Sequence, residues 1–197
     1  MSTKATVPIA ASGDLTAEER AELLRVARRA LEAHFAGTGP FRPEPTTATL
    51  GENRGAFVTL HRARGGDLRG CVGMMRSEES LVRTVARMAV SAATEDGRFE
   101  PVTPAELEEL QLEISALGPM LPIPPEEVEV GRHGLLISHE GRRGVLLPQV
   151  PVEHEWDRET FLDHTCLKAG LLPGSWKEEG VELLSFTAEV FGEEGGG

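Results

Sequence analysis

The sequence predicts an α+β protein in which an antiparallel or mixed β-sheet is flanked by helices. Two stretches have the pattern of β-hairpins, because runs of β-branched, aromatic or aliphatic residues surround Gly-containing turns at residues 64–67 and 141–144. Segments with helical spacing of apolar residues stand apart from these hairpins. No G-x-G-x-x-G motif follows a predicted strand, so a doubly wound nucleotide-binding fold is disfavoured.

The first helix is predicted to begin after Thr16, which has the capping-box spacing to Glu19. Apolar residues then recur at helical spacing until Gly37 interrupts the pattern. Residues 38–49 contain three prolines and are predicted to form an extended connector.

The first hairpin pairs residues 55–61 with residues 68–72 and places Cys71 on its second strand. Ser77 has the pattern of an N-cap, since two glutamates and then apolar residues at helical spacing follow it. Cys71 is therefore expected just ahead of a helix N-terminus, where backbone amides would lower the pKa of its thiol.

A short helix is predicted after Thr103, followed by a strand over residues 112–117 that alternates apolar and polar residues. Residues 119–125 contain four prolines and are interpreted as a second connector between subdomains. The second hairpin spans residues 134–147, and Asp157 is predicted to cap a helix that holds Cys166 in the core and ends at Gly170. A closing strand is expected over residues 184–190.

Composition limits the classes of function. The chain has 197 residues, of which 40% are hydrophobic and 26% charged, and its net charge of −12 disfavours general binding to nucleic acid. The sequence shows neither a signal-peptide pattern nor an apolar run long enough to cross a membrane. Two cysteines are too few for a disulfide framework, so a reducing compartment and a cytoplasmic location are expected.

The motif Leu68–Gly73 (LRGCVG) resembles the signature of the AMMECR domain family, and other stretches agree with that family in the same order: residues 55–60, 96–99, 112–117, 131–134 and 146–150. The bacterial and archaeal branch, AmmeMemoRadiSam system protein A, is the most similar, because residues 156–157, 168–171 and 176–177 also fit. Val72, where isoleucine is commoner, is a conservative departure.

The resemblance implies one domain over residues 15–191, made of two intertwined α+β subdomains with the cysteine motif near the cleft between them. Residues 1–14 and the Gly-rich tail 192–197 are expected to be flexible. The family has no established activity or cofactor. Its members occur beside Memo-like and radical-SAM proteins, or fused to them, which suggests these as partners.

The enzyme hypothesis takes Cys71 as a nucleophile, His133 as its base and Glu113 as an orienting or acid–base carboxylate. Arg69 would hold an anion, and Gly70 and Gly73 would let a ligand approach the backbone. Gln149, from the matched stretch 146–150, completes the expected ligand-binding residues.

Three alternatives stay open at the sequence level. A binding module would hold an anionic small molecule or a protein segment at the same residues without catalysis. Zinc binding by Cys71, His133 and Glu113 is weaker, since the ligands lack the close spacing of a structural site, and no metal is assigned. An RNA-related role is disfavoured by the acidic charge, and pairing with a second copy as a homodimer is left open.

Overall fold

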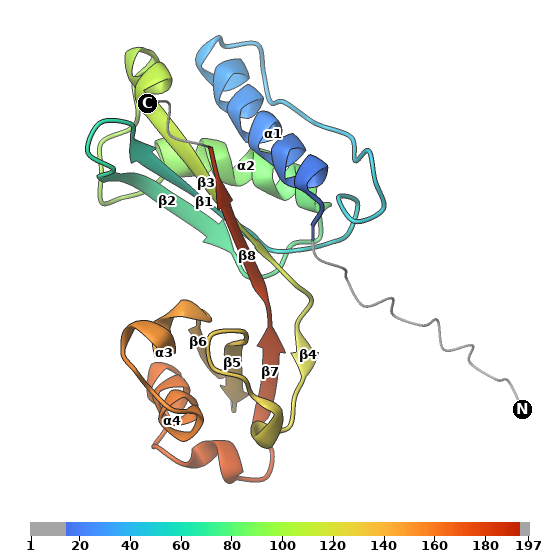
Figure 1. Ribbon diagram of the computed structural model, residues 1–197, viewed down its shortest axis with the longest axis vertical. Coiled ribbons are helices and arrows are strands. Elements are labelled where there is room, and N and C mark those ends of the chain that lie inside the picture. Colours follow the sequence, from blue (N-terminus) through green and yellow to red (C-terminus); the bar gives the residue numbers. More distant parts are fainter. Residues whose placement is uncertain (1–14, 194–197) are drawn as a thin grey trace, which may run out of the picture.

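The computed structural model describes residues 15–193 and consists of two lobes, each built on its own four-stranded antiparallel sheet (Figure 1). The large lobe comprises residues 15–117 and 188–193 and has the strand order β2-β1-β3-β8. The small lobe comprises residues 121–186 and has the order β4-β7-β5-β6. The predicted α+β class is confirmed.

The elements of the large lobe are α1 (Ala17–Phe35), β1 (Ala56–Arg62), β2 (Leu68–Met74), α2 (Leu81–Thr94), the 3₁₀ helix η1 (Pro104–Glu109), β3 (Leu110–Leu117) and β8 (Ala188–Gly192). Those of the small lobe are β4 (Leu121–Pro122), η2 (Pro125–Glu127), β5 (Gly134–His139), β6 (Arg142–Leu146), α3 (Gln149–Glu153), α4 (Arg158–Lys168), η3 (Ser175–Lys177) and β7 (Glu182–Phe186).

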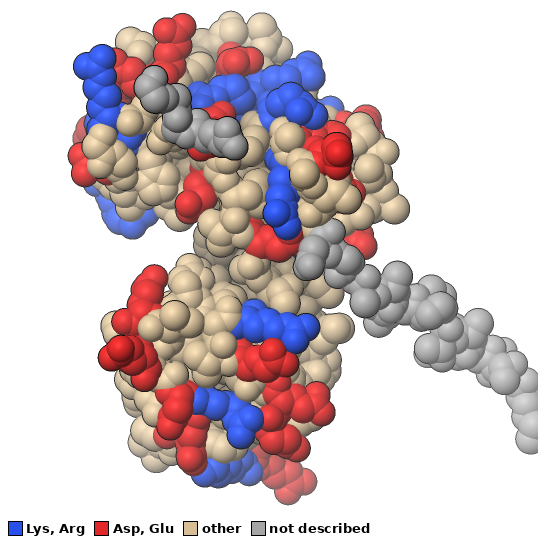
Figure 2. All heavy atoms as spheres, in the orientation of Figure 1, with Lys and Arg blue, Asp and Glu red and all other residues tan. Residues whose placement is uncertain are grey.

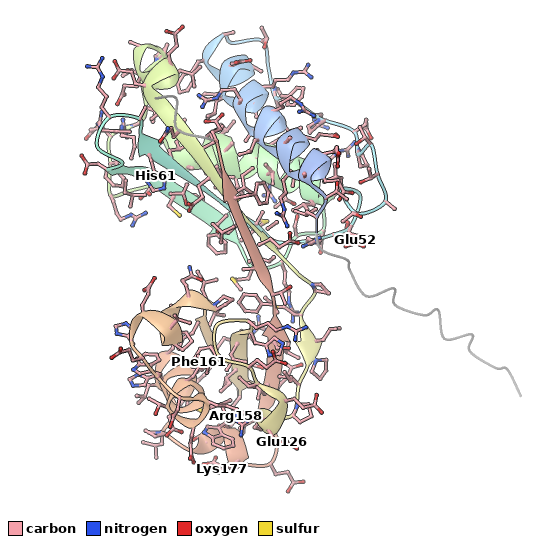
Figure 3. All side chains as sticks on the ribbon, viewed as in Figure 1. Glu52, His61, Glu126, Arg158, Phe161 and Lys177 are labelled. Atoms are coloured by element: carbon pink, nitrogen blue, oxygen red, sulfur yellow. The ribbon has the colours of Figure 1, made fainter. Side chains whose placement is uncertain are left out.

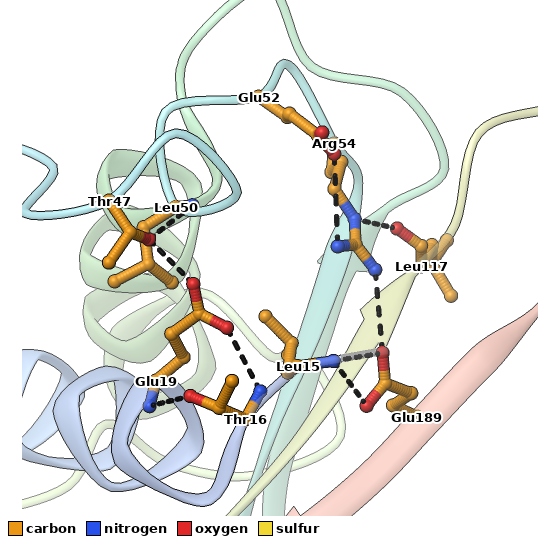
Figure 4. A network of polar contacts seen from close by, with 9 residues as sticks. All are labelled: Leu15, Thr16, Glu19, Thr47, Leu50, Glu52, Arg54, Leu117 and Glu189. Carbon is orange, nitrogen blue, oxygen red and sulfur yellow. Dashed lines mark hydrogen bonds and ion pairs between the residues drawn. The ribbon is translucent and has the colours of Figure 1, made fainter. Parts of the chain in front are cut away.

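The predicted capping box starts α1. The Glu19 amide donates to Thr16 Oγ1 at 3.2 Å, and the Thr16 amide donates to Glu19 Oε2 at 2.9 Å. The other Glu19 oxygen accepts a hydrogen bond of 2.6 Å from the Thr47 hydroxyl, which lowers the pKa of Glu19 and ties the connector to α1 (Figure 4).

Helix α2 begins later than the sequence predicts. Its N-cap is Ser80, whereas the expected N-cap, Ser77, accepts hydrogen bonds from the Glu79 amide and the Thr84 hydroxyl in a separate turn. The Leu81 amide donates to the Glu52 carbonyl, so a loop contact from elsewhere in the chain fixes where the helix starts.

Both long helices pack on one face of the large sheet. Alternate residues of β1 and β3 form this buried core with α1 and α2: Ala56, Val58, Leu60, Leu112, Ile114 and Ala116. The intervening residues of β1 and β3 are only partly buried, because they point to the opposite side of the sheet. We call this side the open face.

The predicted closing strand is two strands that belong to different sheets. Strand β7 lies in the small lobe and β8 in the large lobe, with Thr187 between them. The Gly118 amide donates to the Thr187 carbonyl at 2.8 Å, so the two segments that cross between the lobes lie side by side. We call residues 118–120 and Thr187 the neck.

A buried arginine joins the strands at the large-lobe end of the neck (Figure 4). Arg54 Nε donates to the Leu117 carbonyl at 2.7 Å, and its Nη2 lies 3.8 Å from Glu189. Glu189 also accepts a hydrogen bond of 3.0 Å from the Leu15 amide, which precedes α1. The end of β3, the start of β8 and the start of α1 are therefore held together.

The small lobe has its own core, in which Leu135 and Ile137 of β5 pack with Phe161 and Cys166 of α4. Figure 3 shows Phe161 within this lobe. Cys166 is fully buried and burial raises the pKa of its thiol, in agreement with the predicted core role. The predicted cap is also present, because the Asp157 side chain accepts from the Thr160 amide at 2.8 Å.

Strand β8 extends to Gly192, one residue into the predicted tail, and Glu193 pairs with Arg28. The expectations for residues 1–14 and for the rest of the tail lie outside the described residues. Within residues 15–193, no helix has the length and apolar character needed to span a bilayer.

Candidate functional site

Cys71 lies on the open face in a row of residues that crosses the large sheet. Thr59 of β1 stands directly opposite Cys71 of β2 and, on its other side, opposite Glu113 of β3. Directly opposite residues of antiparallel strands project to the same side of a sheet. Thr59 Oγ1 lies within hydrogen-bond distance of Cys71 Sγ, at 3.2 Å. We call Cys71, Thr59 and Glu113 the cysteine row.

The residues on either side of the cysteine row complete the open face. On one side, His61 stands between Leu68 and Gln111, with its Nδ1 3.2 Å from the Gly66 carbonyl. Figure 3 shows His61 toward the end of the sheet that is remote from the small lobe. On the other side, Phe57 stands opposite Gly73. The row therefore lies between an imidazole and an aromatic ring.

The two glycines of the cysteine motif serve packing within the protein. A Cβ atom at Gly73 would lie 2.2 Å from the Phe57 ring, and one at Gly70 would lie 2.2 Å from the Ala92 carbonyl oxygen of α2. The space beside each glycine is thus already filled by the chain. The expectation that they admit a ligand stays a prediction without a contact to support it.

Asp96, just after α2, holds the outer edge of β2. Its Oδ2 accepts a hydrogen bond of 2.8 Å from the Cys71 amide, a group that an edge strand would otherwise expose. Arg98 donates to the same carboxylate from Nε at 2.9 Å and from Nη2 at 2.7 Å. The Arg98 hydrogen bond, followed by that of the Cys71 amide, holds the pKa of Asp96 well below its usual range.

The helix beside Cys71 presents the opposite end from the one expected. Cys71 contacts Asp96, two residues beyond the end of α2, while α2 begins at Leu81. The nearby Ala92 carbonyl belongs to the last turn of α2. The expected position of Cys71 just ahead of a helix N-terminus is therefore wrong, because the end of α2 that lies beside β2 is its C-terminal end.

Arg69 is buried, with its side chain only 7% exposed, and its guanidinium faces Glu106. Its Nε and Nη2 donate to the two Glu106 oxygens at 2.9 and 3.2 Å, and its Nη1 donates to the Glu100 carbonyl at 2.9 Å. The Arg69 hydrogen bond lowers the pKa of Glu106 to about 2. A ligand anion would have to displace Glu106, so we assign Arg69 a structural role.

The remaining predicted site residues belong to the small lobe. His133 directly precedes β5, and its Nδ1 accepts a hydrogen bond of 3.1 Å from the Glu129 amide. Desolvation, followed by the Arg132 charge, lowers the pKa of His133. Gln149 is exposed at the start of α3. Among residues 15–193, no hydrogen bond joins His133 or Gln149 to the cysteine row, whereas Cys71 and Glu113 share one row.

Neither of the two cavities described next includes Cys71, and the described residues form no metal-ligand cluster at the cysteine row. A cavity of about 750 Å³ lies between α1, the connector and α2, and one of about 370 Å³ lies beside Met74 and Arg76. Neither is lined by Cys71, so the expected cleft at the cysteine is not seen in them. In the described part of the chain, no group of three or more His, Cys, Asp or Glu side chains could hold a metal ion.

Comparison with known proteins relates this fold to one family. A family model described as AMMECR1 matches residues 24–191. The chain is 42% identical over 188 residues to Protein MK0488 of Methanopyrus kandleri, covering 91% of each chain. A protein of Thermococcus gammatolerans is 46% identical over 182 residues, covering 87% of this chain and 89% of that one.

A solved structure shows the same fold. The crystal structure of uncharacterized protein PH0010 from Pyrococcus horikoshii is 41% identical, with a TM-score of 0.71. The match covers 87% of this chain and 90% of that chain. The similarity therefore includes residues of both lobes.

Proposed function

The chain belongs to the AMMECR1 family, and from this premise we propose that it is a cysteine-dependent enzyme whose reacting group is the Cys71 thiol on the open face of the large sheet. The observation that supports the proposal is the cysteine row, which aligns a thiol, a hydroxyl and a carboxylate across three neighbouring strands. Such a row supplies a nucleophile and a group that can take its proton.

The geometry gives each member of the row a role. The Thr59 hydroxyl donates to Cys71 Sγ and stabilises the thiolate, which is the nucleophilic form. Glu113 stands on the far side of Thr59 and accepts the thiol proton through the hydroxyl or a water molecule. Asp96 fixes the backbone of Cys71 and so keeps the sulfur in register with Thr59.

Alkylation by iodoacetamide tests this proposal in the intact protein. We expect Cys71 to react at neutral pH faster than free cysteine, and Cys166 to react far more slowly because it is buried. Thr59→Val should slow Cys71 several-fold by removing the hydroxyl. The rate of each cysteine is followed by mass spectrometry of its peptide across a pH series.

Further variants sort the proton acceptors. Glu113→Gln should slow the alkylation of Cys71 at neutral pH, because it removes the proposed proton acceptor, whereas His133→Gln should leave the rate unchanged. His61→Gln is included because His61 shares the open face with the row. A Cys71 thiol that reacts no faster than free cysteine at any pH would overturn the proposal.

A second candidate is a binding module that holds a segment of another protein. The observation that favours it is the apolar border of the open face, where the exposed side chains of Leu68 and Val190 lie on either side of the cysteine row. Memo-like and radical-SAM proteins are the partners proposed for either function. Pull-down with purified candidates separates the two, because Cys71→Ser should abolish catalysis and leave such binding intact.

A further inference from the structure

Arg98 places a guanidinium group beside Cys71 at the outer edge of β2. Its Nη2 lies 3.5 Å from the Cys71 carbonyl oxygen and is held there by the Asp96 carboxylate. Asp96 accepts from the Cys71 amide as well, so one carboxylate fixes both groups. The position of Arg98 relative to Cys71 is therefore set by the fold.

Arg98 differs from Arg69 in the exposure of its side chain and in the donors that its guanidinium group keeps available. The Arg98 side chain is 58% exposed, whereas that of Arg69 is 7% exposed. Asp96 takes the Nε and Nη2 donors of Arg98, and within residues 15–193 no hydrogen bond uses its Nη1. Guanidinium donors that remain exposed are suited to carboxylate and phosphate groups.

We propose that Arg98 is the anion-binding residue of the Cys71 site and that it receives the carboxylate or phosphate group of a small-molecule substrate. The inference rests on the proposed function, since it names the class of molecule that would react at Cys71. The anionic group would sit at the outer edge of β2, and the reacting atom would reach over the open face to Sγ.

The surrounding charges set how strong this subsite is. Asp96 neutralises part of the Arg98 charge while it orients the guanidinium, and the chain as a whole has a net charge of −12. The ring of Phe99 lies 5.5 Å below the guanidinium and packs against it. We therefore expect a modest preference for anions, in the range of exposed ion pairs.

A pair of alkylating reagents that differ in charge tests the proposal. Iodoacetate carries the carboxylate that iodoacetamide lacks, so the ratio of their rates at Cys71, relative to the same ratio for free cysteine, measures anion recruitment. We expect Arg98→Gln to lower this ratio by roughly two- to five-fold. Arg98→Lys, which keeps the charge, should retain much of the ratio.

Arg64→Gln is the matched control, because it removes the same charge from an exposed residue of the β1–β2 turn. It should leave the ratio unchanged. Inorganic phosphate and acetate, added separately, should each slow the reaction of iodoacetate in the unsubstituted protein and not in Arg98→Gln. The anion that protects at the lower concentration indicates whether phosphate or carboxylate is preferred.

Each outcome separates this inference from the proposed function. An unchanged ratio in Arg98→Gln overturns the anion subsite even if Cys71 remains highly reactive. An equal fall with both reagents also overturns it, since Arg98 would then only position the Cys71 backbone. If Cys71 reacts slowly but the ratio of the two rates still depends on Arg98, the anion subsite is supported and the enzyme proposal is overturned. Thermal unfolding confirms that each variant is folded.

Discussion

The amide of Cys71 donates a hydrogen bond to the carboxylate of Asp96, with 2.8 Å between Cys71 N and Asp96 Oδ2. This bond joins the edge of the large sheet to the segment that follows α2, and the same carboxylate holds Arg98. The two partners belong to separate sequence motifs, 68–73 and 96–99. The Asp96 motif therefore supports the backbone of the cysteine motif.

Asp96→Asn should lower the free energy of unfolding at pH 7 by about 1–2 kcal/mol, because hydrogen bonds to a charged acceptor become bonds to a neutral one. Urea denaturation measures the change. Asp67→Asn, which removes the same charge from an exposed turn, is the control and should have little effect. Equal losses in the two variants would contradict a specific role for the bond.

The same comparison has a predicted pH dependence. The pKa of Asp96 is lowered in the folded protein, so the unfolded chain takes up the proton at the higher pH. The stabilisation by the ionised Asp96 carboxylate is fully present above about pH 4, which is the pKa of an aspartate in the unfolded chain. It is lost as the pH falls toward the pKa of Asp96 in the folded protein. The stability difference between the unsubstituted protein and Asp96→Asn should therefore shrink below about pH 4. A difference that stays constant down to pH 2 would argue against the lowered pKa.

Glu106→Gln should lower the free energy of unfolding by about 3 kcal/mol, because it leaves the buried Arg69 guanidinium without its counter-charge. Glu108→Gln, at an exposed position of the same 3₁₀ helix, is the matched variant and should be nearly neutral. The pKa of Glu106 is lowered to about 2 in the folded protein, whereas a glutamate in the unfolded chain has a pKa of about 4.3. The ion pair therefore stabilises the fold fully above about pH 4.3, and this stabilisation is lost as the pH falls toward 2. Similar denaturation midpoints for the two variants would refute the buried ion pair.

Gly118→Ala should destabilise the protein by about 1–3 kcal/mol, because the new Cβ would lie 2.4 Å from Thr187 Oγ1 in the neck. Thr187→Ala removes that oxygen, so the double variant should be more stable than the sum of the two single changes predicts. A double-mutant cycle in urea measures this coupling. Strict additivity would show that the two neck segments adjust independently.

Local patterns predicted the elements whose boundaries depend on neighbouring residues. The capping box at Thr16 and Glu19 and the cap at Asp157 are confirmed because each is closed by bonds within three residues. The start of α2 could not be predicted in this way, since it depends on a contact between Leu81 and Glu52. The alternation of apolar and polar residues around Thr187 likewise predicts extended backbone. It does not indicate that β7 and β8 belong to two different sheets.

Part of the candidate site could also be predicted. Alternation along β1 and β3 implies that Thr59 and Glu113 share the side opposite the core, but only the register places them beside Cys71. The motif at residues 96–99 predicts no role for Asp96 or Arg98 by itself, because Asp96 contacts Cys71 across 25 residues and Arg98 contacts it across 27. On the face shown in Figure 2, acidic and basic side chains are interspersed over both lobes.

Leu117, the last residue of β3, stands directly opposite Ala188, the first residue of β8. The entire small lobe is thus inserted at the tip of a β-hairpin that the large lobe would otherwise close with a tight turn. Replacing residues 119–186 with a two-residue Asn-Gly turn should join β3 to β8 without altering their register, because the Gly118 amide already donates to the Thr187 carbonyl across the two strands. The cysteine row would then be retained in a minimal, single-lobe version of the protein.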